Sequence, residues 1–275
     1  LIKTLIRTVK RLCSFSPASR LQMAALEKSF GCGKDAWQPF RFMLENGMEV
    51  IVTGQIDRVD ILHEDGRDFI VIIDYKSGNK KIDLTQVYFG LELQLLTYMY
   101  IALLNLDGDA VPAAILYCYV RDDKTFLNRP VTEKEKEELY NKRSKLNGCY
   151  LQDSQVMQKL DTSMEGISQY LNLRLKRDGT LSTQSVNVYS EETWQSLLLL
   201  TSDRIRAIAE CIAKGDISIR PILLSQRTPC QYCPYAAVCS FDPKLKENKY
   251  AVEQKRKAIE IIKEMEGGGA AHGLD

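Results

Sequence analysis

Hydrophobic and polar residues alternate over residues 48–60, and this period of two is typical of a β-strand. The pattern places Asp57 near the end of that strand. Asp65-Gly66, a dipeptide favoured in tight hairpin turns, separates it from a second β-rich run, Phe69–Lys76. We therefore expect the two runs to pair as an antiparallel hairpin, which ends at Ser77-Gly78-Asn79.

A different spacing, with apolar residues three and four positions apart, predicts helices elsewhere in the chain. The expected helices cover residues 1–9, 84–104, 132–145, 191–214 and 244–266, and a third strand is expected over residues 113–120. Gln94 and Tyr98 are one helical turn apart, so they share a face of their helix. The chain opens on Leu1 without a capping signal and closes on glycine-rich residues 267–275, so we expect a piece of a longer protein with a flexible tail.

The composition favours a globular protein without a strong overall charge. The chain has 275 residues, 45% of them hydrophobic, and its 37 Lys and Arg against 36 Asp and Glu give a formal net charge of +1. Any contact with nucleic acid must therefore be local rather than spread over the surface. No stretch of about 18 uncharged apolar residues is present, so we expect a cytoplasmic protein without a membrane span. The run of mixed charge over residues 133–138 is expected to be a solvated helix face.

An acidic and a basic side chain leave the same face of the second strand, because Asp74 and Lys76 are separated by one residue. The rest of that face is apolar, and Asp57 on the neighbouring strand would add a second carboxylate. Two carboxylates on an apolar sheet repel each other unless they share a cation. Oxygen ligands of this kind suit Mg²⁺ or Mn²⁺, which can activate a water molecule for phosphodiester hydrolysis. The alternative is that Asp57–Arg58 and Asp74–Lys76 are surface ion pairs on a hairpin.

Three sequence motifs in a fixed order extend this pattern. Gly54-x-Ile56-Asp57-Arg58-x-Asp60 is followed by Ile73-Asp74-Tyr75-Lys76-Ser77-Gly78 and then by Gln94-Leu95-Leu96-Thr97-Tyr98. Together they resemble the nuclease motifs of the RecB-type branch of the PD-(D/E)XK superfamily. The resemblance implies an α/β, restriction-endonuclease-like core with a mixed sheet flanked by helices. It also implies that Asp57, Asp74 and the backbone carbonyl of Tyr75 bind the metal, that Lys76 assists the attack, and that Gln94 and Tyr98 face the metal-bound water and DNA.

Cysteines form a second candidate site near the end of the chain. The chain has eight cysteines, and Cys230, Cys233 and Cys239 form a C-x2-C-x5-C run. This spacing serves zinc and iron–sulfur sites alike, and either normally takes four protein ligands. Cys13 and Cys32 are possible fourth ligands, whereas Cys118 and Cys211 are expected in the core, because each has apolar neighbours.

With this cysteine run, the chain resembles the AddB family of helicase-nuclease subunits over nearly its whole length. The stretches that carry the likeness also include Gly31-x-Gly33, residues 83–91 and Thr228-Pro229-Cys230. The resemblance implies a [4Fe–4S] cluster on the three cysteines and a distant fourth. It also implies an exonuclease domain of an ATP-dependent protein that cuts single-stranded DNA from duplex ends, next to an AddA-type helicase partner, during repair. The nuclease domain would cover residues 1–266, with its core over about 40–125 and its helical and cysteine segment over about 190–245.

One element of the family pattern has no counterpart in this chain. RecB-type nucleases use a histidine upstream of the first aspartate motif, but the two histidines here are His63 and His272, which we expect to be exposed in the hairpin turn and in the tail. The rival interpretation is a non-catalytic DNA-binding or assembly module with a zinc site. Lys76 favours the nuclease, because a structural hairpin needs no amine beside two acids.

Overall fold

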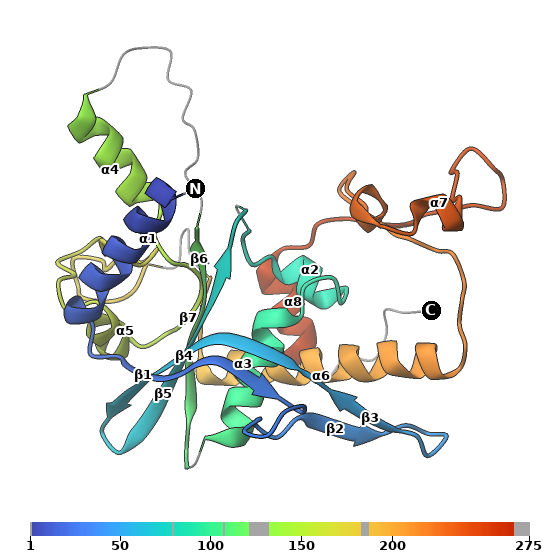
Figure 1. Cartoon of the computed structure of the whole chain (residues 1–275), viewed down its shortest axis with the longest axis horizontal. Coiled ribbons are helices and arrows are strands. Elements are labelled where there is room, and N and C mark those ends of the chain that lie inside the picture. Colours follow the sequence, from blue (N-terminus) through green and yellow to red (C-terminus); the bar gives the residue numbers. More distant parts are fainter. Residues whose placement is uncertain (1, 79, 107, 121–131, 183–186, 267–275) are drawn as a thin grey trace.

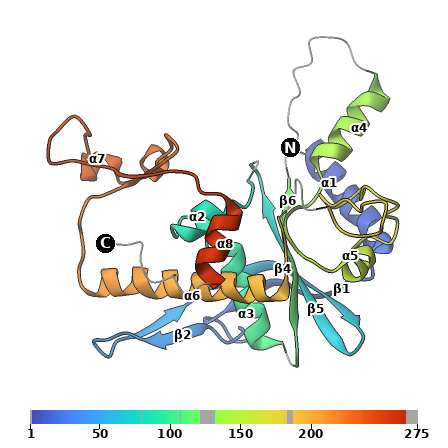
Figure 2. The same ribbon diagram turned by 180° about the vertical axis from the view of Figure 1, so that it is seen from behind.

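A mixed β-sheet forms the centre of the molecule, with helices on both of its faces (Figure 1). The computed structural model describes residues 2–78, 80–106, 108–120, 132–182 and 187–266. The helices α1 (Ile2–Phe15), α4 (Glu133–Arg143) and α5 (Ser154–Leu160) lie on one side of the sheet. On the other side lie α2 (Leu84–Tyr88), α3 (Gln94–Asn105), α6 (Glu191–Ala213) and α8 (Ala258–Glu266), as the view from behind also shows (Figure 2). The expectation of a mixed sheet flanked by helices is confirmed.

Six strands make the main sheet in the order β1-β4-β5-β6-β7-β8. Their bounds are β1 Gln22–Phe30, β4 Gly54–Glu64, β5 Arg67–Lys76, β6 Val111–Tyr119, β7 Asn147–Leu151 and β8 Asn187–Tyr189. The β5–β6 and β7–β8 pairs are parallel, and the other neighbours are antiparallel. Strands β5 and β6 are therefore central, and both are buried along most of their length.

The β4–β5 hairpin has the geometry that its turn residues favour. Asp65 and Gly66 have φ angles of +49° and +76°, and two successive positive φ angles are what a type I′ hairpin turn requires. The expected hairpin is confirmed, although β4 runs on to Glu64 and His63 is an exposed strand residue rather than a turn residue.

Three expected elements differ from the structure. The expected strand over residues 48–60 is broken at Thr53, so β3 (Glu49–Val52) pairs with β2 (Phe40–Met43) in a separate sheet, and Asp57 lies near the start of β4. The expected helix over residues 84–104 is two helices, because Gly90 adopts a φ angle of +73° between α2 and α3. In the expected helix over residues 244–266, only α8 is helical, and it follows strand β10 (Ala251–Glu253).

Packing of α3 and α6 against the sheet builds the core next to β5. Helix α3 contacts β5 and β6, and α6 packs against α3. Ile70, Ile72, Met99 and Trp194 are completely buried in this layer. A side chain on the α3 face of β5 is therefore withdrawn from bulk water, which raises the cost of any charge placed there.

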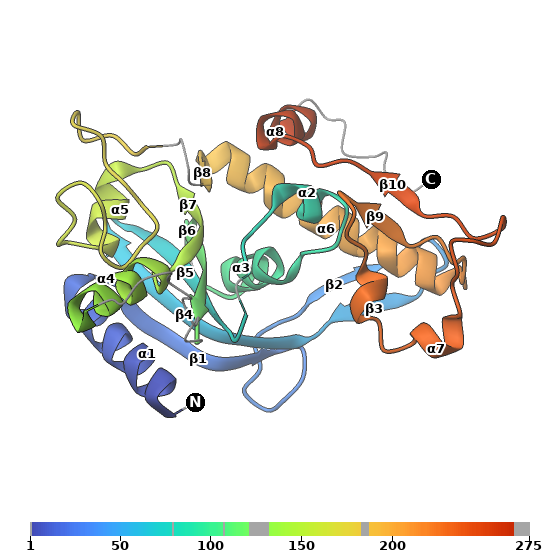
Figure 3. The ribbon, with the colours of Figure 1, turned by 90° about the horizontal axis from the view of Figure 1, so that it is seen from above.

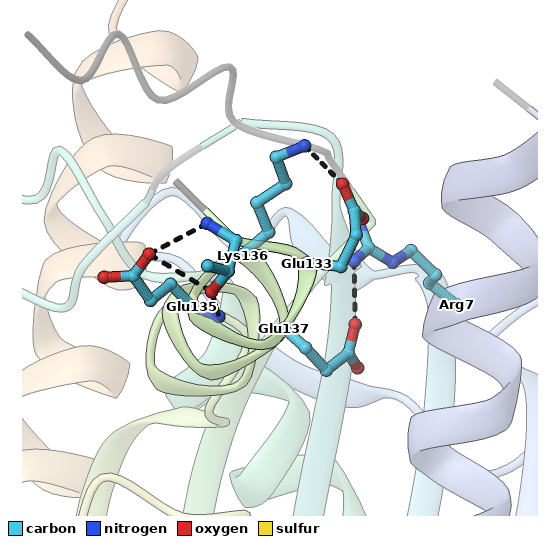
Figure 4. A network of polar contacts seen from close by, with 6 residues as sticks. Arg7, Glu133, Glu135, Lys136 and Glu137 are labelled. Carbon is cyan, nitrogen blue, oxygen red and sulfur yellow. Dashed lines mark hydrogen bonds and ion pairs between the residues drawn. The ribbon is translucent and has the colours of Figure 1, made fainter. Parts of the chain in front are cut away.

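Helix α4 has the mixed-charge surface that its sequence predicts. Thr132 and Glu135 form a capping box at its start, and Lys136 pairs with Glu133 at 2.5 Å (Figure 4). The Arg7 guanidinium of α1 donates to Glu137 at 2.8 Å and so links the two helices. No residue of α4 is buried, so its charges serve contacts at the surface.

The chain after α6 loops away from the main sheet and then returns to α6 at α8 (Figure 3). Strand β9 (Ile222–Leu224) pairs in parallel with β10, and between them lie the short helices η2 (Pro229–Tyr232) and α7 (Ala236–Cys239). Helix α8 then packs against α2 and α6. None of the helices in the described part of the chain combines the length and apolar character needed to cross a membrane.

Candidate active site

The β4–β5 register brings Asp57 and Asp74 together. Arg58 lies opposite Ile73, so the next pair along the antiparallel strands is Asp57 and Asp74, and side chains of such a pair share a face. Asp57 is fixed further by its own carboxylate, which accepts a hydrogen bond from the backbone N–H of Tyr75 at 2.8 Å. The structure therefore brings both carboxylates to the face that α3 covers.

Asp74 is completely buried, and its charge is poorly compensated. The Lys76 ammonium forms an ion pair with it at 2.6 Å, yet neither carboxylate oxygen of Asp74 accepts a well-aligned hydrogen bond from a described residue. Burial raises the pKa of the Asp74 carboxyl above its ordinary value of 3.8, Lys76 opposes the rise and the Asp57 charge adds to it. A buried carboxylate with free oxygen lone pairs needs another cationic partner to be stable in its charged form.

Three side chains form a hydrogen-bonded line from the strand to α3. The Lys76 ammonium donates to the amide oxygen of Gln94 at 3.1 Å, and the Gln94 amide nitrogen donates to the Tyr98 hydroxyl at 2.9 Å. Phe30 packs edge-on against the Tyr98 ring at a centroid distance of 6.1 Å. Gly54 leaves room for Phe30, since a Cβ atom at position 54 would lie 2.7 Å from that ring. The line fixes the direction of the Lys76 side chain.

The oxygen atoms of this site fit a divalent cation that prefers hard oxygen ligands. Asp57 and Asp74 supply carboxylate oxygens, and Mg²⁺ is commonly held by one or two carboxylates together with water and substrate phosphate. The oxygens of buried Asp74, which accept no well-aligned hydrogen bond from the described residues, are the direct observation for this fit. Lys76 also pairs with Asp74, so the site holds a positive charge that can face a phosphate oxygen.

Beside these residues lies a second group of polar side chains, which the sequence motifs do not include. Tyr117 on β6 is paired with Asp74 in the parallel register, and its buried hydroxyl donates to Glu92 at 2.7 Å. Lys80 forms an ion pair with the same Glu92 oxygen at 3.3 Å. Glu92 stands two residues before Gln94, in the break between α2 and α3. Glu92 was not predicted as a site residue, because we expected one continuous helix there. Its position two residues before the motif residue Gln94 was the signal that could have identified it.

Arg58 and Asp60 lie on the opposite face of the sheet. The Arg58 guanidinium donates two hydrogen bonds of 2.8 Å to the carboxylate of completely buried Asp60. Burial raises the pKa of Asp60, and Arg58 acts against that rise. The alternative of an Asp57–Arg58 surface pair is therefore wrong, because Arg58 pairs with Asp60 across the sheet from Asp57.

The three clustered cysteines do not converge on one centre. Cys233 is exposed, Cys230 and Cys239 are partly buried, and the segment that carries them lies away from the sheet (Figure 1). Across the described ranges, no group of three or more His, Cys, Asp or Glu side chains is placed to hold a metal ion. Cys13 and Cys32 are exposed as well, so they do not complete such a group, and the arrangement does not fit a cluster as it stands.

The other expected positions are divided between core and surface. Cys118 is buried and Cys211 is partly buried, whereas His63 is exposed and pairs with Asp68 at 2.6 Å. The tail over residues 267–275, which includes His272, lies outside the described residues. No histidine is therefore placed beside the carboxylates in the described part of the chain.

A mixed sheet with neighbouring strand carboxylates, an adjacent lysine and a covering helix is the arrangement expected of a nuclease of the PD-(D/E)XK class. The family model for the PD-(D/E)XK nuclease superfamily matches residues 3–240. The chain belongs to this superfamily, and it is therefore an enzyme of the nuclease class.

Curated relatives narrow the likeness further. The chain is 33% identical over 268 residues to the B subunit of the ATP-dependent helicase/deoxyribonuclease of Clostridium kluyveri, with 96% of this chain and 23% of the relative covered. It is 35% identical over 278 residues to the protein of that name from Bacillus subtilis, covering 98% and 24%. For the Clostridioides difficile protein of the same name the identity is 36% over 238 residues, covering 84% and 20%. The chain thus spans about a quarter of the length of these relatives.

Proposed function

We propose that this chain is a Mg²⁺- or Mn²⁺-dependent deoxyribonuclease domain that cuts single-stranded DNA. The observation that carries the proposal is Asp74, which is completely buried beside Asp57 and whose carboxylate pairs with the Lys76 ammonium but accepts no well-aligned hydrogen bond from the described residues. In this proposal these oxygens would hold the cation, together with Asp57 and the backbone carbonyl of Tyr75. When bound, the cation makes water a better nucleophile and offsets charge on the phosphate.

The remaining site residues then have positional roles. Lys76 stands beside Asp74 and can direct the attacking water or neutralise a phosphate oxygen, as a preorganised cation does in a water-poor site. Gln94 restrains the Lys76 ammonium, and Tyr98 restrains Gln94 in turn. The chain therefore orders Lys76 on its α3 side with two uncharged side chains, Gln94 and Tyr98.

The parent protein is proposed from the relatives' names. A chain that matches about a quarter of the B subunit of a helicase/deoxyribonuclease is the nuclease portion of such a subunit in this proposal. Strand ends released by an ATP-driven helicase, including an AddA-type partner, would then reach the site as single strands. Exonucleolytic digestion of broken duplex ends during recombinational repair follows as the proposed role.

The test is cleavage of a single-stranded oligonucleotide by the purified protein and by Asp74→Asn. The variant keeps the size of the side chain but removes a charged ligand, so cleavage should fall by at least about a hundredfold, the upper range for losing even an indirect metal contact. The exposed carboxylate of Asp242 provides the control, since Asp242→Asn should leave the rate unchanged. Digestion that persists in Asp74→Asn at the wild-type rate would contradict the assignment of this site.

We propose, separately, an iron–sulfur cluster on Cys230, Cys233 and Cys239. The C-x2-C-x5-C spacing supports it, and the described cysteines would have to rearrange around a fourth ligand to hold it. Iron and sulfide should be present in protein purified without oxygen and should be lost in Cys233→Ala. Stoichiometric zinc without iron would instead favour the zinc site of the rival interpretation, in which the chain is a binding module.

A further inference from the structure

Lys80 is the half-exposed end of a buried polar group whose other members are anchored. Its side chain is 41% exposed, whereas the side chain of its partner Glu92 is 4% exposed. One Glu92 oxygen accepts from Tyr117 and pairs with Lys80, while the other oxygen is buried without a hydrogen-bond partner among the described residues. The Lys80 side chain is therefore held by buried Glu92 and is still partly exposed to solvent.

The backbone around Lys80 is fixed as well. The Tyr119 hydroxyl of β6 donates to the backbone carbonyl of Lys80, and Asp83 caps the start of α2 three residues later by accepting from Thr85 at 3.0 Å. A lysine on a free loop would lose more conformational entropy on binding a ligand than one whose backbone is held in place.

Lys80 also shares an aromatic platform with the proposed catalytic lysine. The ammonium groups of Lys76 and Lys80 lie 5.9 and 5.5 Å from the centre of the Tyr117 ring. Lys76 is committed to Asp74 and Gln94, whereas an ammonium has three donors and Lys80 is paired with Glu92 alone among the described residues. Among these contacts Lys80 thus has two donors left for a ligand, whereas Lys76 has one.

We propose that Lys80 binds a backbone phosphate of the DNA strand, the phosphate that neighbours the one being cut. Glu92 is then the positioning residue that holds Lys80 in place. This inference rests on the proposed function, because it takes single-stranded DNA as the ligand. An ammonium acts as a point charge on phosphate and carries no sequence information, so Lys80 contributes affinity to every sequence equally.

The competing explanation is that Lys80 only neutralises buried Glu92. Lys80→Gln would then leave an uncompensated carboxylate and destabilise the protein, and any loss of DNA binding would follow from that. The double variant Lys80→Gln/Glu92→Gln separates the two explanations, because it removes both charges and its new amide oxygen at position 92 can still accept from Tyr117. Its stability should return towards that of the wild type.

The measurement is fluorescence anisotropy of a labelled single-stranded oligonucleotide in chelator-containing buffer over a series of salt concentrations, with thermal melting of each variant. Lys80→Gln should bind several-fold more weakly, and the slope of log Kd against log salt should fall by about 0.7, the value for one phosphate contact on a single strand. The double variant should melt like the wild type yet keep the weak binding and the reduced slope. Lys80→Arg should restore both.

Lys136→Gln is the matched control, since Lys136 pairs with Glu133 on the exposed surface of α4 (Figure 4). Its affinity and slope should equal those of the wild type. If Lys80→Gln keeps the affinity and salt slope of the wild type, or if both return in the double variant, Lys80 does not bind a phosphate. That outcome would leave the proposed function standing. A wild-type protein that neither binds nor cuts the oligonucleotide would overturn the proposed function instead.

Discussion

At the scale of single residues, Asp74 is a group whose position disfavours the charge that its chemistry requires. It is completely buried, and its neighbour Asp57 adds repulsion that Lys76 offsets only in part. Placing a charge where the fold resists it is common at functional sites, where stability is lost in exchange for activity. Removing the charge should therefore affect folding and catalysis in opposite directions.

We expect Asp74→Asn to melt a few degrees above the wild type at neutral pH in metal-free buffer. Because the pKa of Asp74 is raised in the folded state, the wild type loses stability as pH rises from 3.8 towards that raised value, and the variant does not. The difference should vanish below 3.8, where position 74 is uncharged in both proteins.

Thermal melting with and without Mg²⁺ completes this test. The cation should raise the melting temperature of the wild type, since a ligand that binds the folded state stabilises it, but it should leave Asp74→Asn unmoved. Equal stabilisation of both proteins by Mg²⁺ would mean that the cation binds elsewhere.

At the scale of elements, the break between α2 and α3 shapes the site. Gly90 has a φ angle of +73°, and the turn it makes brings Glu92 under Tyr117 and starts α3 at Gln94. A side chain at Gly90 would meet Ile208 of α6 at 3.5 Å, an ordinary contact distance, so the backbone conformation is the main obstacle to substitution.

Gly90→Ala should cost roughly 1–2 kcal/mol of stability, the penalty of a left-handed conformation for a residue with a Cβ. It should also lower the cleavage rate, because a shift in the turn moves Glu92 and Gln94. Gly66→Ala in the hairpin turn has a similar φ angle of +76° and open space around it, so it should match the stability loss but keep the cleavage rate. Equal rates in the two variants would show that the α2–α3 turn does not control the site.

The elements that sequence alone predicted are those whose signals are local. The Asp65-Gly66 turn requires only its own residues to be favourable, so the hairpin and the pairing of Asp57 with Asp74 could be predicted. The break at Gly90 was not predicted, because apolar spacing continues across it and does not encode the positive φ angle of that residue. Glu92 is likewise invisible to motif spacing, since its burial beneath Tyr117 depends on a contact between distant segments.

At the scale of the whole molecule, α8 fastens the end of the described chain to the segment that carries the site. Glu264 accepts from the Tyr88 hydroxyl of α2 and pairs with Arg256, and both Arg256 and Arg204 of α6 stack on the Tyr88 ring. Arg204 is 5% exposed, so Glu264 lies near a guanidinium that has little water to solvate it. Loss of the Glu264 charge should therefore weaken the contact of α8 with both α2 and α6.

We expect Glu264→Gln to lower the melting temperature by a few degrees at neutral pH. The Arg256 guanidinium holds the pKa of Glu264 below its ordinary value of 4.5, so this carboxylate contributes stability above 4.5 that is lost as pH falls through the depressed value. The gap between variant and wild type should close in acid, whereas Glu247→Gln, at an exposed position outside α8, should show no such gap. A gap that persists at low pH would assign the effect to something other than charge.

The separation in sequence between Asp74 and α8 also determines how long a newly synthesised chain has the β4–β5 hairpin without α8. Ribosomes add about 5–20 residues per second and release the chain from its first residue onward, so Glu264 follows Asp74 by roughly ten to forty seconds. Throughout that interval the hairpin can pair while α2 lacks the partner that holds it. The proposed active site, built in this order, reaches its supported form only after the chain has been synthesised as far as α8.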